Sequence, residues 1–571
     1  MISEKKKRTG YPSVDKPWLR YYTEDAINAH LPDCTVYETI YNGNKNYLSD
    51  IALMYFGKKI TYKVLFEQID KTAKAFSTLG IKSGDNVALC MPAVPETIYT
   101  ILALNKIGAN ANMLNPTFSA EQLTDRINDT EAIVLVVINE LYEILENVIP
   151  STSIKTVIAC PAVNSLGTIT KIVKKAKSIP NTIAWNEFIK MGKTTKIVIP
   201  PYKTNSPAIM VYSSGTTGAS KGIQLTNTGI NAAIVECGPY TYGFKRKERY
   251  FLQIPIWFST GIITTGLAPL RYGVCLILEP IYDFSIFDKE IIKYKPNYMI
   301  TATGMVNHMM SNPKLSKTVK YFKCLAIGGE GITRNAENRI NSWLSKNKNP
   351  LKLRKGYGMC ECCGAVTNTE LNCNPLTCSG IPTPHVTVSA FDLKTGEELK
   401  YNQRGEIRVL TPCRMLGYYK KPEETEKYFH TDLKGNIWAC TGDMGYITED
   451  GCVYVIGRLN DSYVNEYNEI IYLFDIERVV LDIPQIRQCK AVVSKINGKL
   501  VHVCHTVLDK SATKEETIRK VRHYCSEKLS DTYQPYLFKF YDDELPVASS
   551  GKLDTLNMRN NIENIFDSRD L

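Results

Sequence analysis

The stretch "MVYSSGTTGASKGIQLT", residues 210–226, decides how the rest of the chain is interpreted. Glycine and hydroxyl residues fill positions 213–218, and they favour neither helix nor strand, because glycine frees the backbone and hydroxyls compete for backbone hydrogen bonds. The apolar run Ala208–Val211 before them is typical of a buried strand. Because α/β folds bind ligands where strands end, we expect this donor-rich loop to cradle phosphate, with Lys221 as a mobile cation.

Two better-known motifs do not fit this loop. In a P-loop a second glycine would fall at Ser220, and a Ser or Thr would follow Lys221, where this chain has Gly222. No G-x-S-x-G frame surrounds Ser213 or Ser214, so the loop is not a nucleophile elbow. A mobile surface turn is the plainer alternative, but a surface turn does not need so many donors beside a buried strand.

The composition is that of an ordinary globular chain. Its 571 residues are 44% hydrophobic and 22% charged, and at one domain per ~150 residues the length predicts about four structural units. The chain has 69 Lys and Arg against 58 Asp and Glu, a net charge of +11 that is dispersed apart from the basic residues 5–8. Nucleic acid is therefore not an expected partner.

The cysteines and the apolar runs bear on the compartment. No apolar segment follows residues 5–8, and no apolar run approaches the ~20 residues of a membrane span. The 17 cysteines are odd in number and scattered, which favours reduced thiols. Those at 360, 362, 363, 373 and 378 have no paired C-x-x-C spacing and no His among them, so a metal site is not expected there. We expect a cytoplasmic protein with no signal peptide and no transmembrane segment.

Most of the chain has an α/β pattern. The apolar runs Ile133–Ile138, Thr156–Ala159 and Leu325–Ile327 predict buried strands of a sheet covered on both faces. Between such runs lie helical patterns, such as 66–79, where apolar residues recur at 66, 69, 73 and 76. This alternation predicts a large N-terminal α/β domain.

The last hundred residues differ from the rest. Val453–Ile456 and Val501–Cys504 predict strands of one small sheet, and Thr513–Leu529 predicts a helix whose Thr513 and Glu516 form a capping box. We therefore predict two domains, a large α/β domain over residues 1–457 and a small, mobile α+β domain over residues 458–571.

Five motifs resemble, in order, those of the adenylate-forming superfamily, which includes acyl-CoA synthetases, luciferases and adenylation domains of peptide synthetases. "YSSGTTGASKG" is similar to its phosphate-binding signature, and "YGMCE" from Tyr357 to its adenine and magnesium motif, usually Y-G-x-T-E. "GEIRVLTPCRMLGYYKKPEET" resembles the next block, and "TGDMGYITEDGCVYVIGRLND" the ribose motif and hinge. "LPVASSGKLD" resembles the segment with the catalytic lysine. The resemblance covers roughly residues 60–556.

The resemblance implies a role for each matching residue. ATP, Mg²⁺ and CoA are the implied cofactors, Lys552 and Glu361 the catalytic residues, Glu361 the metal ligand and Asn460 the hinge. A carboxylate and a triphosphate are both anions, so positioning and charge neutralisation are the chemistry these residues supply. The implied nucleotide-binding residues are Ser213, Ser214, Gly215, Thr216, Thr217, Gly218, Lys221, Gly329, Glu330, Tyr357, Gly358, Cys360, Asp443 and Arg458.

Three departures from the family pattern matter. Cys360 stands where a Thr hydroxyl usually meets the α-phosphate, and a thiol is a weaker donor. The segment after Arg458 is one residue longer than the family pattern. Asn468 then falls where Gly is expected, and Asn tolerates a positive φ better than most residues. In the family that this chain resembles, the loop lines the pantetheine tunnel, so its alteration bears on the acceptor of the acyl group more than on the adenylation.

The region "IPIWFSTGIITTGLAPL" from Ile254 resembles the segment that lines the acyl pocket. Amino-acid-activating relatives place an Asp there, whereas no acid lies between residues 254 and 270 here, and an unpaired buried ammonium would be costly. We therefore expect an uncharged, hydrophobic fatty or aryl acid, with core packing as the alternative interpretation. The candidate substrate-binding residues are Trp257, Phe258, Gly261, Gly329 and Cys362.

Three functions stay open from the sequence. The leading one is an acyl-CoA synthetase that forms an acyl-adenylate and transfers the acyl group to CoA. The second is a free-standing adenylating enzyme that loads a carrier protein. The third is a nucleotide-binding relative without activity, against which the retained Glu361, Asp443, Arg458 and Lys552 argue.

Overall fold

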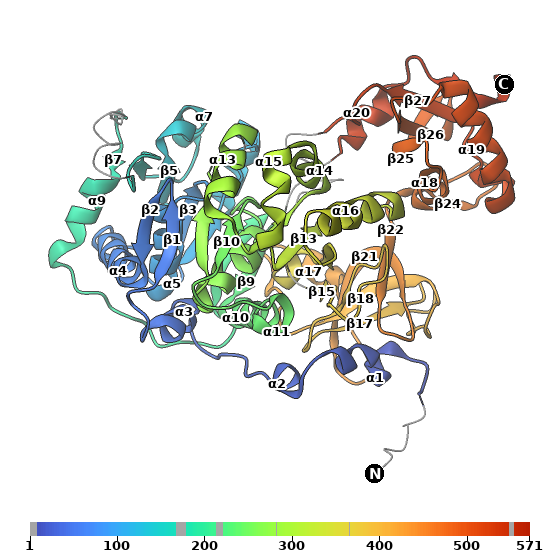
Figure 1. Ribbon diagram of the computed structural model, residues 1–571. Helices are drawn as coiled ribbons and strands as arrows, with labels where there is room; N and C mark the ends of the chain where they lie inside the picture. The colour runs from blue at the N-terminus through green and yellow to red at the C-terminus, as the bar shows by residue number, and fades with distance from the viewer. Residues whose placement is uncertain (1–7, 167–178, 213–220, 281–282, 365, 548–552) are drawn as a thin grey trace, which may run out of the picture.

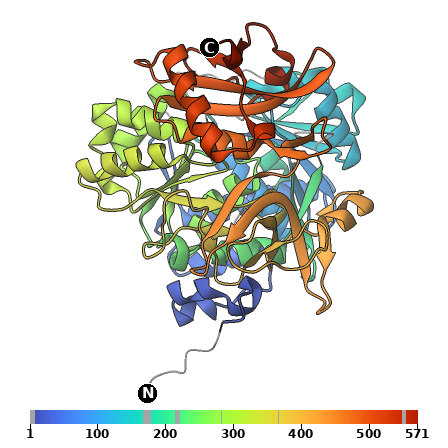
Figure 2. The ribbon, with the colours of Figure 1, turned by 90° about the vertical axis from the view of Figure 1, so that its right-hand side faces the viewer.

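The computed structural model describes residues 8–166, 179–212, 221–280, 283–364, 366–547 and 553–571. Figure 1 shows a large body on which a smaller C-terminal unit sits at one corner, and Figure 2 shows that unit lying across the top of the body. No helix among the described residues has the length and apolar character needed to cross a bilayer.

Two mixed sheets form the centre of the body in the described ranges. One runs in the order β16-β15-β14-β13-β12-β10-β11-β1-β2 and the other in the order β19-β9-β8-β4-β3-β5-β6-β7. The first sheet comprises β1 Ile51–Tyr55, β2 Lys58–Thr61, β10 Arg249–Leu252, β11 Cys275–Leu278, β12 Tyr298–Thr301, β13 Cys324–Gly328, β14 Arg354–Tyr357, β15 Thr367–Asn368 and β16 Ile381–Pro382. The second comprises β3 Asn86–Cys90, β4 Asn110–Met113, β5 Val134–Ile138, β6 Thr156–Cys160, β7 Ile183–Ala184, β8 Pro207–Tyr212, β9 Gly222–Thr226 and β19 Gly417–Tyr418.

Helices cover these sheets, as the alternating pattern predicts. In the helix α4 the apolar positions Phe66, Ile69, Ala73 and Phe76 are all buried, which confirms the predicted stripe. The strands predicted at 133–138, 156–159 and 325–327 are present as β5, β6 and β13. The main helices of the body are α3 Val36–Asn44, α4 Tyr62–Thr78, α5 Pro95–Lys106, α6 Ala120–Asp129, α10 Asn227–Glu236, α13 Phe284–Tyr294, α14 Thr303–Ser311 and α16 Arg334–Lys346.

A third sheet carries the ribose motif. Its described strands run in the order β17-β18-β21-β20, and β22 also pairs with β21. The prediction that 453–456 and 501–504 share one small sheet is therefore wrong, because β22 completes this third sheet and β26 (Lys499–Leu508) lies in another. The strands are β17 Thr387–Phe391, β18 Gly405–Leu410, β20 Phe429–Thr431, β21 Ile437–Ile447 and β22 Val453–Arg458.

The first described residues pack on this third sheet. Trp18 and Tyr22, in the segment that follows the short helix α1 (Pro12–Asp15), bury their rings against Cys373, Cys378 and Cys452. Trp18 is fully buried, and its backbone lies so close to Gly451 that an added Cβ there would be 2.8 Å from Trp18 N. Residues from the start of the described sequence and residues between 373 and 452 thus form one subdomain.

The C-terminal unit has its own core and is α+β, as predicted. A four-stranded sheet, β25-β26-β27-β28, packs against α18 and α19. Thr513 is the N-cap of α19, but its side chain makes no capping hydrogen bond, so the predicted capping box is wrong; Glu516 pairs with Lys520 at 2.8 Å instead. The elements are β23 Ser462–Val464, β24 Ile470–Tyr472, α18 Leu473–Leu481, β25 Ile486–Ile496, β26 Lys499–Leu508, α19 Lys514–Lys528, β27 Leu537–Tyr541, α20 Thr555–Asn560 and β28 Phe566–Asp567.

Candidate active site

A cleft of about 3080 Å³ lies between the body and the C-terminal unit. It exceeds the ~300–1,000 Å³ of a pocket for one small ligand, so it has room for several substrates. Its walls come from the ends of β13 and β14, from β22, and from α18 and β25 of the C-terminal unit. The predicted residues that border it are Lys221, Phe258, Gly329, Glu330, Tyr357, Gly358, Cys360, Glu361, Arg458 and Asn460.

Some predicted residues lie elsewhere or outside the described ranges. Residues 213–218 and Lys552 are not among the described residues. Trp257 is half-buried against the main core and does not border the cleft. Cys362 is fully buried in the core of the third sheet, so its thiol is also away from the cleft.

Gly261 serves the packing of the segment that resembles the acyl-pocket region. It lies in a π-helix over Thr260–Leu267, a form of helix that is often found at functional sites. A Cβ on Gly261 would lie 1.9 Å from the carbonyl oxygen of Pro255, so only glycine fits there. Phe258, just before this helix, is the aromatic residue of the pair at 257 and 258 that borders the cleft.

Glu361 and Lys221 both contact Tyr418. β19 pairs with β9, and Lys221 directly precedes β9. The Tyr418 hydroxyl donates to Glu361 Oε1 at 3.0 Å, and Lys221 Nζ lies 4.8 Å from the centre of the Tyr418 ring. Lys221 Nζ is also 2.5 Å from Glu424 Oε2, and this ion pair lowers the pKa of the Glu424 carboxyl. Both charged side chains of the pair are partly exposed, so phosphate can compete for the lysine.

Glu361 is a suitable ligand for a magnesium ion. It lies in the short turn Cys360–Cys362 and borders the cleft, and its Oε2 accepts no hydrogen bond from any described residue. Within the described ranges no cluster of three or more His, Cys, Asp or Glu side chains could hold a metal. Mg²⁺ commonly uses one or two carboxylates and takes its other ligands from phosphate and water, so a single carboxylate fits this ion.

Asp443 lies directly behind Tyr357 and Arg458. The pairing of β21 with β22 sets Asp443 opposite Arg458, and Arg458 Nε is 2.9 Å from Asp443 Oδ1. The Tyr357 hydroxyl donates to Oδ2 of the same carboxylate. Burial raises the pKa of Asp443, while the Arg458 guanidinium opposes that rise. Each carboxylate oxygen has two acceptor positions, so Asp443 can still receive hydroxyl groups from a ligand.

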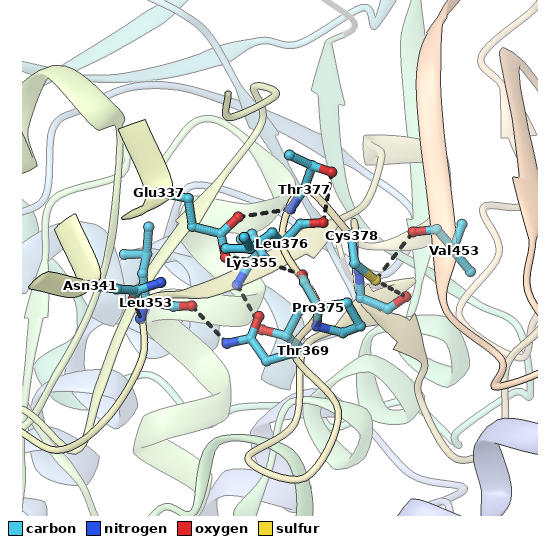
Figure 3. Close-up of polar contacts among 12 residues, drawn as sticks. Glu337, Asn341, Leu353, Lys355, Thr369, Pro375, Leu376, Thr377, Cys378 and Val453 are labelled. Carbon is cyan, nitrogen blue, oxygen red and sulfur yellow. Dashed lines mark hydrogen bonds and ion pairs between the residues drawn. The ribbon is translucent and has the colours of Figure 1, made fainter. Parts of the chain in front are cut away.

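A buried ion pair supports the strand that carries Tyr357 (Figure 3). Lys355 of β14 pairs with Glu337 of α16, and their side chains are 5% and 1% exposed. Glu337 also accepts from Thr377 N at 2.8 Å, and Lys355 donates to the carbonyl oxygen of Pro375 at 2.8 Å. The network thereby fixes the loop between β15 and β16, which borders the cleft at residues 376–379.

The loop after Arg458 contains the predicted left-handed residue. Asn468 has a φ of 62° in the turn between β23 and β24, which confirms that Asn takes the conformation expected of Gly there. Asp461, next to the predicted hinge Asn460, is held by Lys490 Nζ at 2.9 Å, and Lys490 also contacts Glu477 at 2.9 Å. Asp461 is therefore anchored to the C-terminal unit.

Sequence reasoning missed two side chains of the site. Tyr418 and Glu424 both lie in the quoted block from Gly405, but no residue of that block was singled out. Their spacing carries no signal of its own, because only the pairing of β19 with β9 brings them to Lys221 and Glu361. The only indication in the sequence was that the whole block from Gly405 resembles a family motif, which marks the block as part of the site without marking these two residues.

Comparisons with known proteins agree with this geometry. Residues 42–419 match the family model described as AMP-binding enzyme. The chain is 26% identical over 559 residues to a long-chain-fatty-acid–CoA ligase of Bacillus subtilis (strain 168), covering 94% of this chain and 96% of that protein. It is 24% identical over 514 residues to a 2-succinylbenzoate–CoA ligase of Bacillus licheniformis, covering 88% and 95%.

Solved structures share the fold over nearly the whole chain. The anthranilate CoA ligase AuaEII in complex with anthranoyl-AMP has a TM-score of 0.78 at 17% identity, covering 94% of this chain and 98% of its own. ATP-bound MatB from Rhodopseudomonas palustris has a TM-score of 0.78 at 19% identity, covering 93% and 99%. These likenesses confirm the predicted fold class, a large α/β part with a small α+β part. Since the family model matches well over half of its residues, the chain belongs to the AMP-binding enzyme family.

Proposed function

We propose that this protein is an AMP-forming acid–CoA ligase for an uncharged fatty or aryl acid. The single observation that carries the proposal is that one cleft is bordered by Glu361, Lys221, Tyr357 and Arg458. Asp443 lies directly behind Tyr357 and Arg458. Two relatives that align with most of the chain are CoA ligases, one of long-chain fatty acids and one of 2-succinylbenzoate, and this supports the proposed ligase reaction.

In the first half-reaction, a carboxylate oxygen of the acid attacks the α-phosphorus of ATP. The P–O bond to the β-phosphate breaks, and pyrophosphate leaves. Lys221 and the loop 213–218 would hold the outer phosphates, Asp443 the ribose, and Lys552 the developing charge. A magnesium ion held by Glu361 and the phosphates would neutralise charge between the two anions.

In the second half-reaction, the CoA sulfur attacks the carbonyl carbon of the acyl-adenylate. The C–O bond to AMP breaks, AMP leaves, and the thiol loses its proton. CoA then needs space that the C-terminal unit occupies when Lys552 is in the site. A movement of that unit about Asn460 is therefore part of the proposal, and the ion pair between Lys490 and Asp461 supports a pivot before residue 461.

The experiment is a pyrophosphate-release assay over a panel of free acids, run with and without CoA. We expect acid-dependent release of pyrophosphate, and AMP with an acyl thioester when CoA is added. Glu361→Gln should lower the release strongly, whereas Glu423→Gln, an exposed neighbour of Glu424, is the matched control and should not. Absence of acid-dependent release with every acid contradicts the proposal, and an adenylate that only a carrier protein discharges favours carrier loading.

A further inference from the structure

One face of the first sheet of the body, which contains β12 to β15, forms a wall of the cleft. β12, β13, β14 and β15 lie side by side, with Ile300 opposite Ala326, Gly328 opposite Gly356, and Gly356 opposite Asn368. Because side chains alternate along a strand and paired residues point to the same face, these five residues share one face. All five border the cleft.

This wall is almost without polar groups. Ile300 and Ala326 are apolar, and Gly328 and Gly356 have no side chains, so the wall favours the hydrocarbon part of a ligand. A Cβ added to Gly356 would have Asn368 Oδ1 among its nearest atoms, at 3.8 Å. The Asn368 amide therefore lies over the bare glycine surface, on the side of the sheet that faces the cleft.

The Asn368 amide has no hydrogen-bond partner among the residues that the structure describes. Asn368 is 1% exposed, and neither Oδ1 nor Nδ2 has a hydrogen-bond partner among the described residues. Of the described residues that border the cleft, Thr303 and Arg559 also have a buried polar atom without a partner among the described residues, but only Asn368 has two such atoms, and it alone lies on this wall. Such groups are rare in folded proteins because they carry a full desolvation cost, and each calls for an explanation.

We propose that Asn368 determines acid specificity, and that the acid carries a neutral hydroxyl group remote from its carboxyl group. This inference rests on the proposed function. A hydroxyl is the smallest group that both donates and accepts, so it can satisfy Nδ2 and Oδ1 together. A charged group does not fit, because the amide cannot neutralise a charge in an otherwise apolar wall. The rest of the acid is hydrocarbon, which Ile300, Ala326 and the two glycines accommodate.

The test uses matched pairs of acids in the pyrophosphate-release assay. One pair is decanoic acid and ω-hydroxydecanoic acid, and another is phenylpropanoic acid and para-hydroxyphenylpropanoic acid. For the pair whose length matches the wall, we expect kcat/KM to favour the hydroxylated acid by about tenfold or more, because the unsubstituted acid would leave the buried amide unpaired. A preference for the unsubstituted acid in every pair overturns the inference.

Asn368→Leu is the decisive variant, since leucine has the same number and branching of side-chain heavy atoms and no polar atom. It should reverse the preference toward the unsubstituted acid and raise the melting temperature of the ligand-free protein, because it removes a buried unpaired amide. Thr100→Val is the matched control: Thr100 Oγ1 is also buried without a partner among the described residues, but it lies on α5, away from the cleft. That variant should leave the acid preference unchanged.

The outcomes separate this inference from the proposed function. Acid-dependent release at equal rates for both members of every pair keeps the proposed function and overturns the role of Asn368. An unchanged hydroxyl preference in Asn368→Leu also overturns that role. If Asn368→Leu does not fold, Asn368→Val and the wild-type preference still decide the question. Absence of release with every acid overturns both.

Discussion

Asp443 shows how a single residue depends on its neighbours. Its carboxylate is 4% exposed, and the two groups that hold it, the Tyr357 hydroxyl and the Arg458 guanidinium, both border the cleft. A ligand hydroxyl that reaches Asp443 therefore meets an oriented acceptor whose charge Arg458 stabilises. The sequence motif predicted the carboxylate and the arginine, and the structure adds that the tyrosine contacts the carboxylate with its hydroxyl.

Replacing Asp443 with Ala should weaken ATP binding. Each hydrogen bond from a ribose hydroxyl to the carboxylate is worth about 1.5–3 kcal/mol before compensation. The measurement is ATP affinity by isothermal titration calorimetry, with Asp392→Ala, in an exposed turn, as the control. An affinity equal to that of the wild type would remove Asp443 from the nucleotide site.

At the same scale, the sequence predicted the chemistry of residues better than their positions. The resemblance to the family predicted ten residues that border the cleft. They did not predict that Cys362 would be buried away from it or that Gly261 would be needed for backbone packing. Side chains of neighbouring residues in a motif point in turn toward the cleft and toward the core. Adjacent residues in the sequence can therefore have opposite environments.

At the scale of elements, the Lys355–Glu337 pair joins α16 to β14. Lys355→Met should destabilise the protein by about 3–5 kcal/mol, because it leaves the Glu337 charge buried without its cationic partner. The double variant Lys355→Met/Glu337→Leu should recover most of that loss. Urea unfolding measures both, and Lys520→Met, from an exposed pair on α19, should cause no measurable change. Equal losses in the single and double variants would show that the charge is not the cause.

His505 on β26 gives the small unit a predictable response to acid. Its Nδ1 is 2.8 Å from the Tyr541 hydroxyl, and burial, together with Lys539 nearby, lowers the pKa of His505 from 6.5 to about 4. Between those values the unfolded chain binds a proton that the folded unit does not. The contribution of His505 to stability is thus complete above pH 6.5 and is lost as the pH falls toward about 4.

Replacing His505 with Gln should flatten this pH dependence. The difference in unfolding free energy between pH 7 and pH 4 should shrink by up to about 3 kcal/mol, as a pKa shift of that size implies. Urea midpoints over this pH range measure it. The control is His523→Gln, because the His523 side chain is 81% exposed on α19. A slope identical to that of the wild type would exclude His505 as the source.

The positions of helices and strands were predicted better than the contacts that these elements make. The patterns located β5, β6, β13, α4 and α19 to within a few residues, because periodicity is a local property. They did not show that β22 pairs with β21, since an apolar alternation identifies a strand without identifying the sheet that it joins. The failed capping box at Thr513 has a similar cause, because Glu516 had an alternative partner in Lys520 one turn later.

At the scale of the whole molecule, the C-terminal unit meets the body across the cleft and follows a short connection. β22 ends at Arg458 and β23 begins at Ser462, so three residues separate the two parts. The predicted division at residue 458 agrees with where these strands end and begin, and it stays a prediction. Substitutions of Lys552, in the sequence of the C-terminal unit, and of Asn460, in the connection, should affect the two half-reactions differently.

Lys552→Ala should slow adenylate formation by about 10²–10³, the usual effect of losing one electrostatic contact to a developing charge. The same variant should convert pre-made acyl-adenylate and CoA to thioester at close to the normal rate. Asn460→Pro, which restricts φ at the connection, should impair the second step more than the first. Single-turnover assays of each step measure both. Equal loss of both steps in Lys552→Ala, with an unchanged circular dichroism spectrum, would refute this division.

The packing of Trp18 and Tyr22 against Cys373 and Cys452 sets a constraint on synthesis. A chain leaves the ribosome from its N-terminus, at about 5–20 residues per second. Trp18 is made early, yet its partners follow more than 350 positions later in the sequence. For many seconds of translation these aromatic side chains have no native surface to pack against, so the subdomain behind the ribose motif is completed late in translation.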